Sequence, residues 1–181
     1  MKLREQKGFT LIEVIVVAGI IAVLAGILVP LIFKEIDESK ITRAAADVRS
    51  ISSALIVLRK DTGQWPVSAT CLSDTTMMRG SGLMPPLAAN WDSSLGARFD
   101  TIFSTDANGC WPNTWKGPYM AQVTADPWGN SYMMNAKDFP STSNPPAPIW
   151  IISAGPNGIV DTDATATEIL NGVDDIGARI R

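Results

Sequence analysis

Residues 7–33 read KGFTLIEVIVVAGIIAVLAGILVPLIF, and residues 14–33 of this stretch carry no charged side chain. As an α-helix, these twenty residues are long enough to cross a hydrocarbon core of about 30 Å. The run is longer than the apolar region of an ordinary secretory signal peptide, and no small-residue cleavage site follows it. We therefore expect residues 9–33 to form one membrane-spanning helix.

The residues before this run predict its orientation. Lys2, Arg4 and Lys7 stand against a single acidic residue, Glu5. Positively charged flanks remain on the cytoplasmic side of a membrane. We therefore expect the amino terminus in the cytoplasm and the chain after Lys34 outside it.

Residues 34–63 continue the helix with an amphipathic pattern. Apolar side chains recur at steps of mostly three and four residues, which is typical of one buried helix face. They are Ile36, Ile41, Ala45, Val48, Ile51, Ala54, Leu55 and Leu58. No glycine or proline lies between Pro30 and Gly63, so we expect one helix of about fifty residues. Gly63 suits the left-handed position that ends a helix.

Residues 64–181 predict a small extracytoplasmic α+β domain packed on this helix. Residues 64–116 lack a sustained hydrophobic period, so we expect loops there, with one short helix near residues 86–97. Three later segments have the composition of antiparallel strands. They are PYMAQV at 118–123, SYMMN at 131–135 and IWIISA at 149–154. DPWGN at 126–130 has the residues of a tight turn.

The composition excludes several classes of function. The 181 residues contain no histidine, which excludes Ser-His-Asp and Cys-His catalysis as well as histidine metal sites. The net charge of −3 gives no broad basic surface, so nucleic-acid binding is not expected. The sequence contains no glycine-rich phosphate loop, so energy for mechanical work would come from a separate ATPase.

The two cysteines, Cys71 and Cys110, do not form a CxxC motif. One interpretation is a disulfide formed in an oxidising compartment, worth about 4 kcal/mol in the chain-entropy account. The other interpretation is two separate buried thiols.

Glu13 is the one acidic residue of the apolar stretch, and it needs a partner that neutralises it. Lys7 lies six residues back, on a different helical face. A cut between Gly8 and Phe9 would create an α-amino group at the membrane edge, protonated near neutral pH. In a staggered stack of copies, this amine can meet the glutamate of the next copy. The charge pair would then guide polymerisation.

The basic leader, the glycine, the sequence FTLIEV and the long apolar helix resemble the amino terminus of the type IV pilin and type II secretion pseudopilin superfamily. The resemblance implies a pilin-like fold with residues 1–8 as a leader peptide. It implies that prepilin peptidase cuts after Gly8 and that Phe9 becomes the N-methylated first residue. It also implies that Glu13 is required for filament assembly, and Pro30 matches the helix proline of the family.

Acidic and amide side chains are concentrated near the carboxyl terminus. They are Asn157, Asp161, Asp163, Glu168, Asn171, Asp174 and Asp175. By themselves, these residues suit either a solvated acidic loop or a site for calcium, which takes six to eight oxygen ligands.

The segments WKGPYM, DPWGNSYMM, IISAGPNG and DDI resemble the major pseudopilin of type II secretion systems, whose domain ends in a calcium-binding loop. The resemblance implies calcium ligands at the Ala154 carbonyl and at the side chains of Asn157, Asp174 and Asp175. Asn157 stands where the family usually has an aspartate, which should weaken binding. Asp161 or Asp163 could substitute as a ligand.

These features together predict a structural filament subunit that is not an enzyme. By resemblance, it would be anchored in the inner membrane and form a periplasmic pseudopilus that drives type II secretion. Its partners would be further copies of itself, minor pseudopilins, prepilin peptidase and the inner-membrane assembly platform. One alternative is a type IV pilin for adhesion, motility or DNA uptake. The other is a membrane-anchored periplasmic enzyme that uses the carboxylates near the carboxyl terminus.

Overall fold

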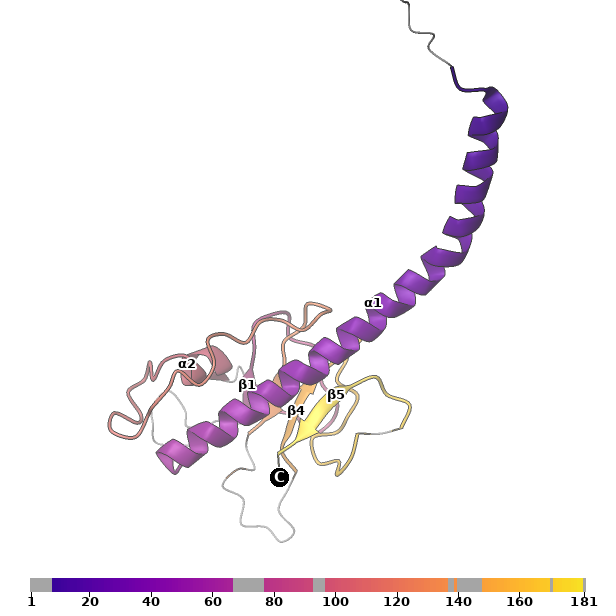
Figure 1. The fold of residues 1–181 in the computed structure, drawn as a ribbon. Coiled ribbons are helices and arrows are strands. Elements are labelled where there is room, and N and C mark those ends of the chain that lie inside the picture. The colour runs from indigo at the N-terminus through magenta and orange to yellow at the C-terminus, as the bar shows by residue number, and fades with distance from the viewer. Residues whose placement is uncertain are drawn as a thin grey trace, which may run out of the picture. The chain divides into compact units, whose positions relative to one another are not determined.

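The protein is described here from a computed structural model. The described residues are 8–66, 77–92, 97–136, 139, 148–169 and 171–180. The chain divides into two compact units, Met1–Lys40 and Ile41–Arg181. One helix, α1 (Leu11–Thr62), begins in the first unit and ends in the second (Figure 1). Its 52 residues confirm the prediction of a single helix of about fifty residues.

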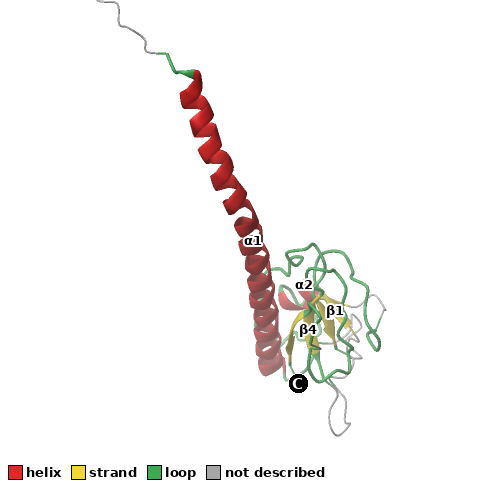
Figure 2. Ribbon diagram, turned by 90° about the vertical axis from the view of Figure 1, so that its right-hand side faces the viewer, coloured by secondary structure: helices red, strands yellow, loops and turns green. Residues whose placement is uncertain are grey.

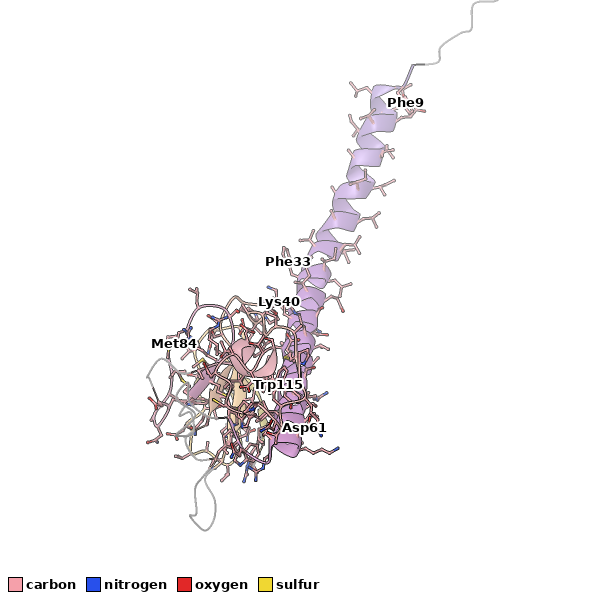
Figure 3. All side chains as sticks on the ribbon, turned by 90° about the vertical axis from the view of Figure 1, so that its left-hand side faces the viewer. Phe9, Phe33, Lys40, Asp61, Met84 and Trp115 are labelled. Carbon is pink, nitrogen blue, oxygen red and sulfur yellow. The ribbon has the colours of Figure 1, made fainter. Side chains whose placement is uncertain are left out.

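In the first unit, α1 presents apolar side chains to its surroundings on all sides. Figure 3 shows them projecting from the helix between Phe9 and Phe33. Ile12 is 69% exposed and Phe33 is 64% exposed. Among the described residues, one helix, α1, has the length and the apolar composition needed to cross a membrane. Its apolar part is not buried within the chain. This segment therefore needs lipid or another protein surface around it.

In the second unit, α1 packs along one side of a β-sheet (Figure 2). Its buried residues are Ala44, Val48, Ile51, Ala54, Leu55 and Leu58. The predicted face was therefore right from Val48 onward. Ile36 and Ile41 are exposed, because the buried part of the face begins only at Ala44. The helix ends as predicted at Gly63, whose φ is +73° and whose N–H donates to the Arg59 carbonyl at 2.8 Å.

The sheet has five short strands in the order β2-β1-β3-β4-β5. The strands are β1 (Met77–Arg79), β2 (Ala97–Arg98), β3 (Met133–Asn135), β4 (Trp150–Ser153) and β5 (Ile176–Arg179). β1 and β2 are parallel, whereas the other three pairs are antiparallel. The expectation of an all-antiparallel sheet is thus wrong, because the chain returns after β1 and enters β2 in the same direction.

Both faces of the sheet are covered. Met78, Met134 and Ile151 lie in the core cluster that contains the buried face of α1. Met133 and Ile152 lie in a second cluster, together with residues of the segments 87–91 and 160–164. The α+β class and the pilin-like arrangement of a long helix on a small sheet are confirmed.

Two predicted elements are corrected. The short helix is α2 (Phe99–Phe103), not a helix near residues 86–97. Residues 118–123 form no strand, because their N–H groups bond elsewhere. The Tyr119 N–H donates to the carbonyl of Phe103 at 2.7 Å, and the Val123 N–H donates to the carboxylate of Asp100 at 2.7 Å.

The predicted turn at DPWGN is present. The Gly129 N–H donates to the Asp126 carbonyl at 3.0 Å, and Gly129 has a φ of +93°. β3 and β4 lie within the segments SYMMN and IWIISA, as expected. This turn therefore leads into the centre of the sheet.

Candidate functional site

The amino end of α1 is closed by Thr10 and Glu13. The N–H and the hydroxyl of Thr10 both donate to Glu13 Oε2, at 2.8 and 2.7 Å. The Glu13 N–H is directed at Thr10 Oγ1, at 3.4 Å. This reciprocal arrangement is a capping box, which satisfies N–H groups at the start of the helix. Sequence reasoning missed Thr10, although the pattern T-x-x-E before an apolar run predicts this motif.

Glu13 is set in apolar surroundings. A shallow groove of about 410 Å³ is lined by Phe9, Ile12, Glu13, Val16 and Val17. Among the described residues, no basic side chain lies within ion-pair distance of Glu13. The carboxylate is therefore held by Thr10 but not neutralised within the described part of the chain.

The other predicted residues of the amino-terminal region lie at different positions along the chain, either just before α1 or within it. Phe9 is 89% exposed and shares the groove with Glu13, and Gly8 precedes it. Pro30 lies inside α1, seventeen residues after Glu13, which corresponds to about 25 Å along a helix axis. The structure thus brings Phe9 and Glu13 together, and it does not bring Pro30 to them.

The terminal loop, defined as residues 154–175, joins β4 to β5, and the structure describes all of it except residue 170. Asn157 connects two of its acidic residues. The Asn157 N–H donates to Asp174 Oδ2 at 2.7 Å, and Asn157 Nδ2 donates to Asp161 Oδ2 at 2.8 Å. Three of the predicted oxygen-rich residues are therefore neighbours.

Asp175 has one satisfied and one unsatisfied carboxylate oxygen. Its Oδ2 accepts hydrogen bonds from the Asp161 N–H at 3.0 Å, the Thr162 N–H at 2.6 Å and the Thr162 hydroxyl at 2.6 Å. Its Oδ1 is buried without a hydrogen-bond partner. Burial raises the pKa of Asp175, while the bonds from Thr162 and Asp161 act in the opposite direction. A buried carboxylate oxygen without a donor fits the needs of a bound cation.

Gly155 allows the two ends of the terminal loop to meet. Its φ is +64°, and a Cβ at this position would collide with the carbonyl oxygen of Asp174. Only glycine combines this backbone angle with such a close approach. Ala154, the predicted carbonyl ligand, precedes it and is fully buried.

Asp163 is occupied away from the predicted ligands. Its carboxylate accepts from Asn90 Nδ2 at 2.8 and 3.1 Å and from the Thr165 N–H and hydroxyl at 2.7 Å. Within the described ranges, no three acidic or cysteine side chains gather closely enough to hold a metal ion. Calcium would therefore need backbone carbonyls in addition to the carboxylates of Asp174 and Asp175.

Cys110 is disulfide-bonded. The Asp106 carboxylate fixes the backbone at this cysteine. It accepts hydrogen bonds from the N–H of Cys110 and the N–H of Trp111, each at 2.9 Å. Cys71, the other cysteine of the predicted pair, lies outside the described residues.

Two protein-family models match the chain. The prokaryotic N-terminal methylation motif matches residues 3–29, and type II secretion system protein G matches residues 99–172. The first match includes Gly8, Phe9 and Glu13, and the second ends just before Asp174 and Asp175.

The chain is similar in sequence to curated proteins of type II secretion systems and to a pilin. The chain is 29% identical over 164 residues to type II secretion system core protein G of Pseudomonas aeruginosa, with 91% of this chain and 95% of that protein covered. It is 27% identical to the protein of the same name from Escherichia coli K12, with 90% of each chain covered. It is 33% identical to toxin coregulated pilin of Vibrio cholerae over 41% of this chain and 34% of the pilin. No solved structure matches the chain significantly.

Proposed function

Because this chain is a major pseudopilin of the type IV pilin superfamily and a structural subunit of a type II secretion pseudopilus, we propose that it polymerises through α1 after cleavage between Gly8 and Phe9. The observation that carries this proposal is the apolar part of α1, which is exposed on all sides and ends at the Thr10–Glu13 capping box. Such a surface is stable only in lipid or against similar helices.

Cleavage would change the surroundings of Glu13. The new α-amino group at Phe9 carries a positive charge near neutral pH and adjoins the groove that contains the Glu13 carboxylate. Glu13 already accepts two hydrogen bonds from Thr10 of its own chain, through Oε2. Its Oε1 is therefore the oxygen we assign to the amine of an adjacent copy, which would make subunit addition depend on a charge pair.

The membrane orientation and the partners follow from this proposal. The basic residues before α1 hold the amino terminus in the cytoplasm until prepilin peptidase removes the leader. The second unit then lies in the periplasm, where minor pseudopilins and the inner-membrane assembly platform meet the growing filament. In this role the chain is mechanical and has no catalytic activity.

Gene deletion with complementation tests the proposed role. We expect exported enzymes to accumulate in the periplasm of the deletion strain, while twitching and surface pili persist. The full chain should restore export, whereas residues 34–181 carried to the periplasm by a cleavable secretory signal peptide should not, because they cannot polymerise without the apolar part of α1. Loss of pili with normal export would contradict the proposal and favour a type IV pilin. Restoration by the truncated chain would favour a periplasmic enzyme.

We further propose that the terminal loop binds one calcium ion. The support comes from Asp175 Oδ1, which is buried and accepts no hydrogen bond, and from Asp174, whose carboxylate is adjacent in sequence. The Ala154 carbonyl and Asn157 Oδ1 would complete the protein ligands, while the Asp161 carboxylate accepts from Asn157 Nδ2 at 2.8 Å. Asn157 supplies a neutral oxygen, so the affinity should be lower than with an aspartate at this position.

A further inference from the structure

The DPWGN turn contains a buried carboxylate with a role beyond the turn itself. Asp126 is only 4% exposed. Its Oδ1 accepts from the N–H groups of Trp128 at 3.0 Å and Asn130 at 2.8 Å. These two bonds fix the turn, and they leave the second oxygen of the carboxylate free for another donor.

Asp126 Oδ2 connects the turn to the end of β4. It accepts the hydroxyl proton of Ser153 at 2.7 Å, and Ser153 is fully buried. Since a hydroxyl has one proton, Ser153 Oγ then offers its lone pairs, and it accepts the Gly155 N–H at 3.2 Å. A chain of hydrogen bonds thus runs from a buried charge through Ser153 to the first turn of the terminal loop.

This first turn is where the proposed calcium ligands meet. The Gly158 N–H donates to the Gly155 carbonyl at 3.3 Å, which closes the turn around Asn157. The Asn157 N–H holds the Asp174 carboxylate, and the Asp174 carbonyl lies against Gly155. A shift of Gly155 would therefore move both Asn157 and Asp174.

The same two segments also approach each other at Gly158. A Cβ on Gly158 would lie 3.3 Å from Asn130 Nδ2, so the side chain of Asn130 lies directly beside the turn. The DPWGN turn is therefore hydrogen-bonded to the terminal loop at Gly155 through Ser153, and it lies beside the loop at Gly158.

We propose that Asp126 and Ser153 are positioning residues of the calcium site: they do not touch the ion, and they hold the Gly155–Gly158 turn where Asn157 and Asp174 can bind it. This inference rests on the calcium site proposed above. Removal of groups that orient metal ligands typically weakens metal binding by about 10- to 100-fold.

A calorimetric titration of the full-length chain in detergent with calcium tests the proposal. We expect Ser153→Ala to bind calcium at least about tenfold more weakly than the wild type. Ser131→Ala is the matched control, because Ser131 is equally buried but donates to the Gly82 carbonyl, outside this chain of bonds. It should bind calcium like the wild type.

A second measurement separates positioning from a general loss of stability. Amide hydrogen exchange at Gly155 and Asn157 in calcium-free protein should be faster in Ser153→Ala and unchanged in Ser131→Ala. Should Ser153→Ala fail to fold, Asp126→Asn serves instead, since its amide oxygen can still accept the two turn N–H groups. Equal calcium binding by Ser153→Ala and the wild type would overturn this inference alone. A wild type that binds no calcium would overturn the calcium site as well.

Discussion

Cells that produce Glu13→Gln in place of the wild-type chain should lose most of their pseudopilus filaments. Glutamine keeps the shape of the side chain and can still accept from Thr10, but it carries no charge. The α-amino group of the adjacent copy would then be desolvated without a carboxylate, and leaving one member of such a pair unpaired is strongly unfavourable. We expect the filament yield to fall to about one tenth of the wild-type yield or lower. Immunoblotting of the sheared filament fraction, compared with the total subunit, measures this yield.

Thr10→Ala is the matched variant for this experiment. It removes the hydroxyl of the capping box and keeps the charge of Glu13. Losing an N-cap side chain costs about 1 kcal/mol of helix stability, so filament yield should fall much less than in Glu13→Gln. If Glu13→Gln formed filaments at the normal yield, the charge pair would play no part in assembly. If both variants were equally impaired, the cap rather than the charge would be responsible.

Calcium should raise the melting temperature of the full-length chain in detergent. The reason is the buried Oδ1 of Asp175, which accepts no hydrogen bond from the protein and would gain a cation. A ligand present at one hundred times its dissociation constant stabilises the folded state by about 2.7 kcal/mol. For a chain of this length, that corresponds to an increase of about 5–10 °C. Differential scanning calorimetry with added calcium, compared with excess chelator, measures the shift.

Two comparisons make this experiment specific. Magnesium at the same concentration should have a much smaller effect, because it demands octahedral geometry that an irregular loop does not provide. Asp175→Asn should abolish the calcium response, because an amide at this position cannot supply the charge. A melting temperature that is the same in calcium and in chelator would rule out the site.

The long helix could be predicted because its signals are local. An uninterrupted apolar run, an amphipathic continuation and Gly63 at the end fix α1 to within a few residues. The residue at which burial begins could not be predicted from local sequence. Ile41 and Ala44 lie three residues apart on the same helix, and only Ala44 is buried in the domain. Periodicity shows that a helix has a buried face, whereas the partner surface decides which turns of that face are used.

The strands divide in the same way. β3 and β4 were recognisable because their apolar residues follow clear turn and breaker residues. β1, β2 and β5 were not predicted, because their strand conformation depends on the neighbours with which they pair. The segment 118–123 shows the opposite case, since α2 captures N–H groups that a sheet would have used.

The candidate sites could be predicted only in part from the sequence. Glu13 was conspicuous as a charge in an apolar run, and Thr10 could have been found from its spacing to Glu13. The engagement of Asp163 by Asn90, 73 residues away, could not be read from the sequence. Neither could the unsatisfied oxygen of Asp175 or the bond between Asp126 and Ser153, since each depends on the folded arrangement of distant segments.

The intact mass of the subunit in purified filaments tests the central claim most directly, because it joins processing to polymerisation. We predict a single species that lacks residues 1–8 and carries one additional methyl group at Phe9. Filaments built from the unprocessed chain, or a processed chain that is found only as dispersed monomers in the membrane, would contradict assembly through the new amino terminus.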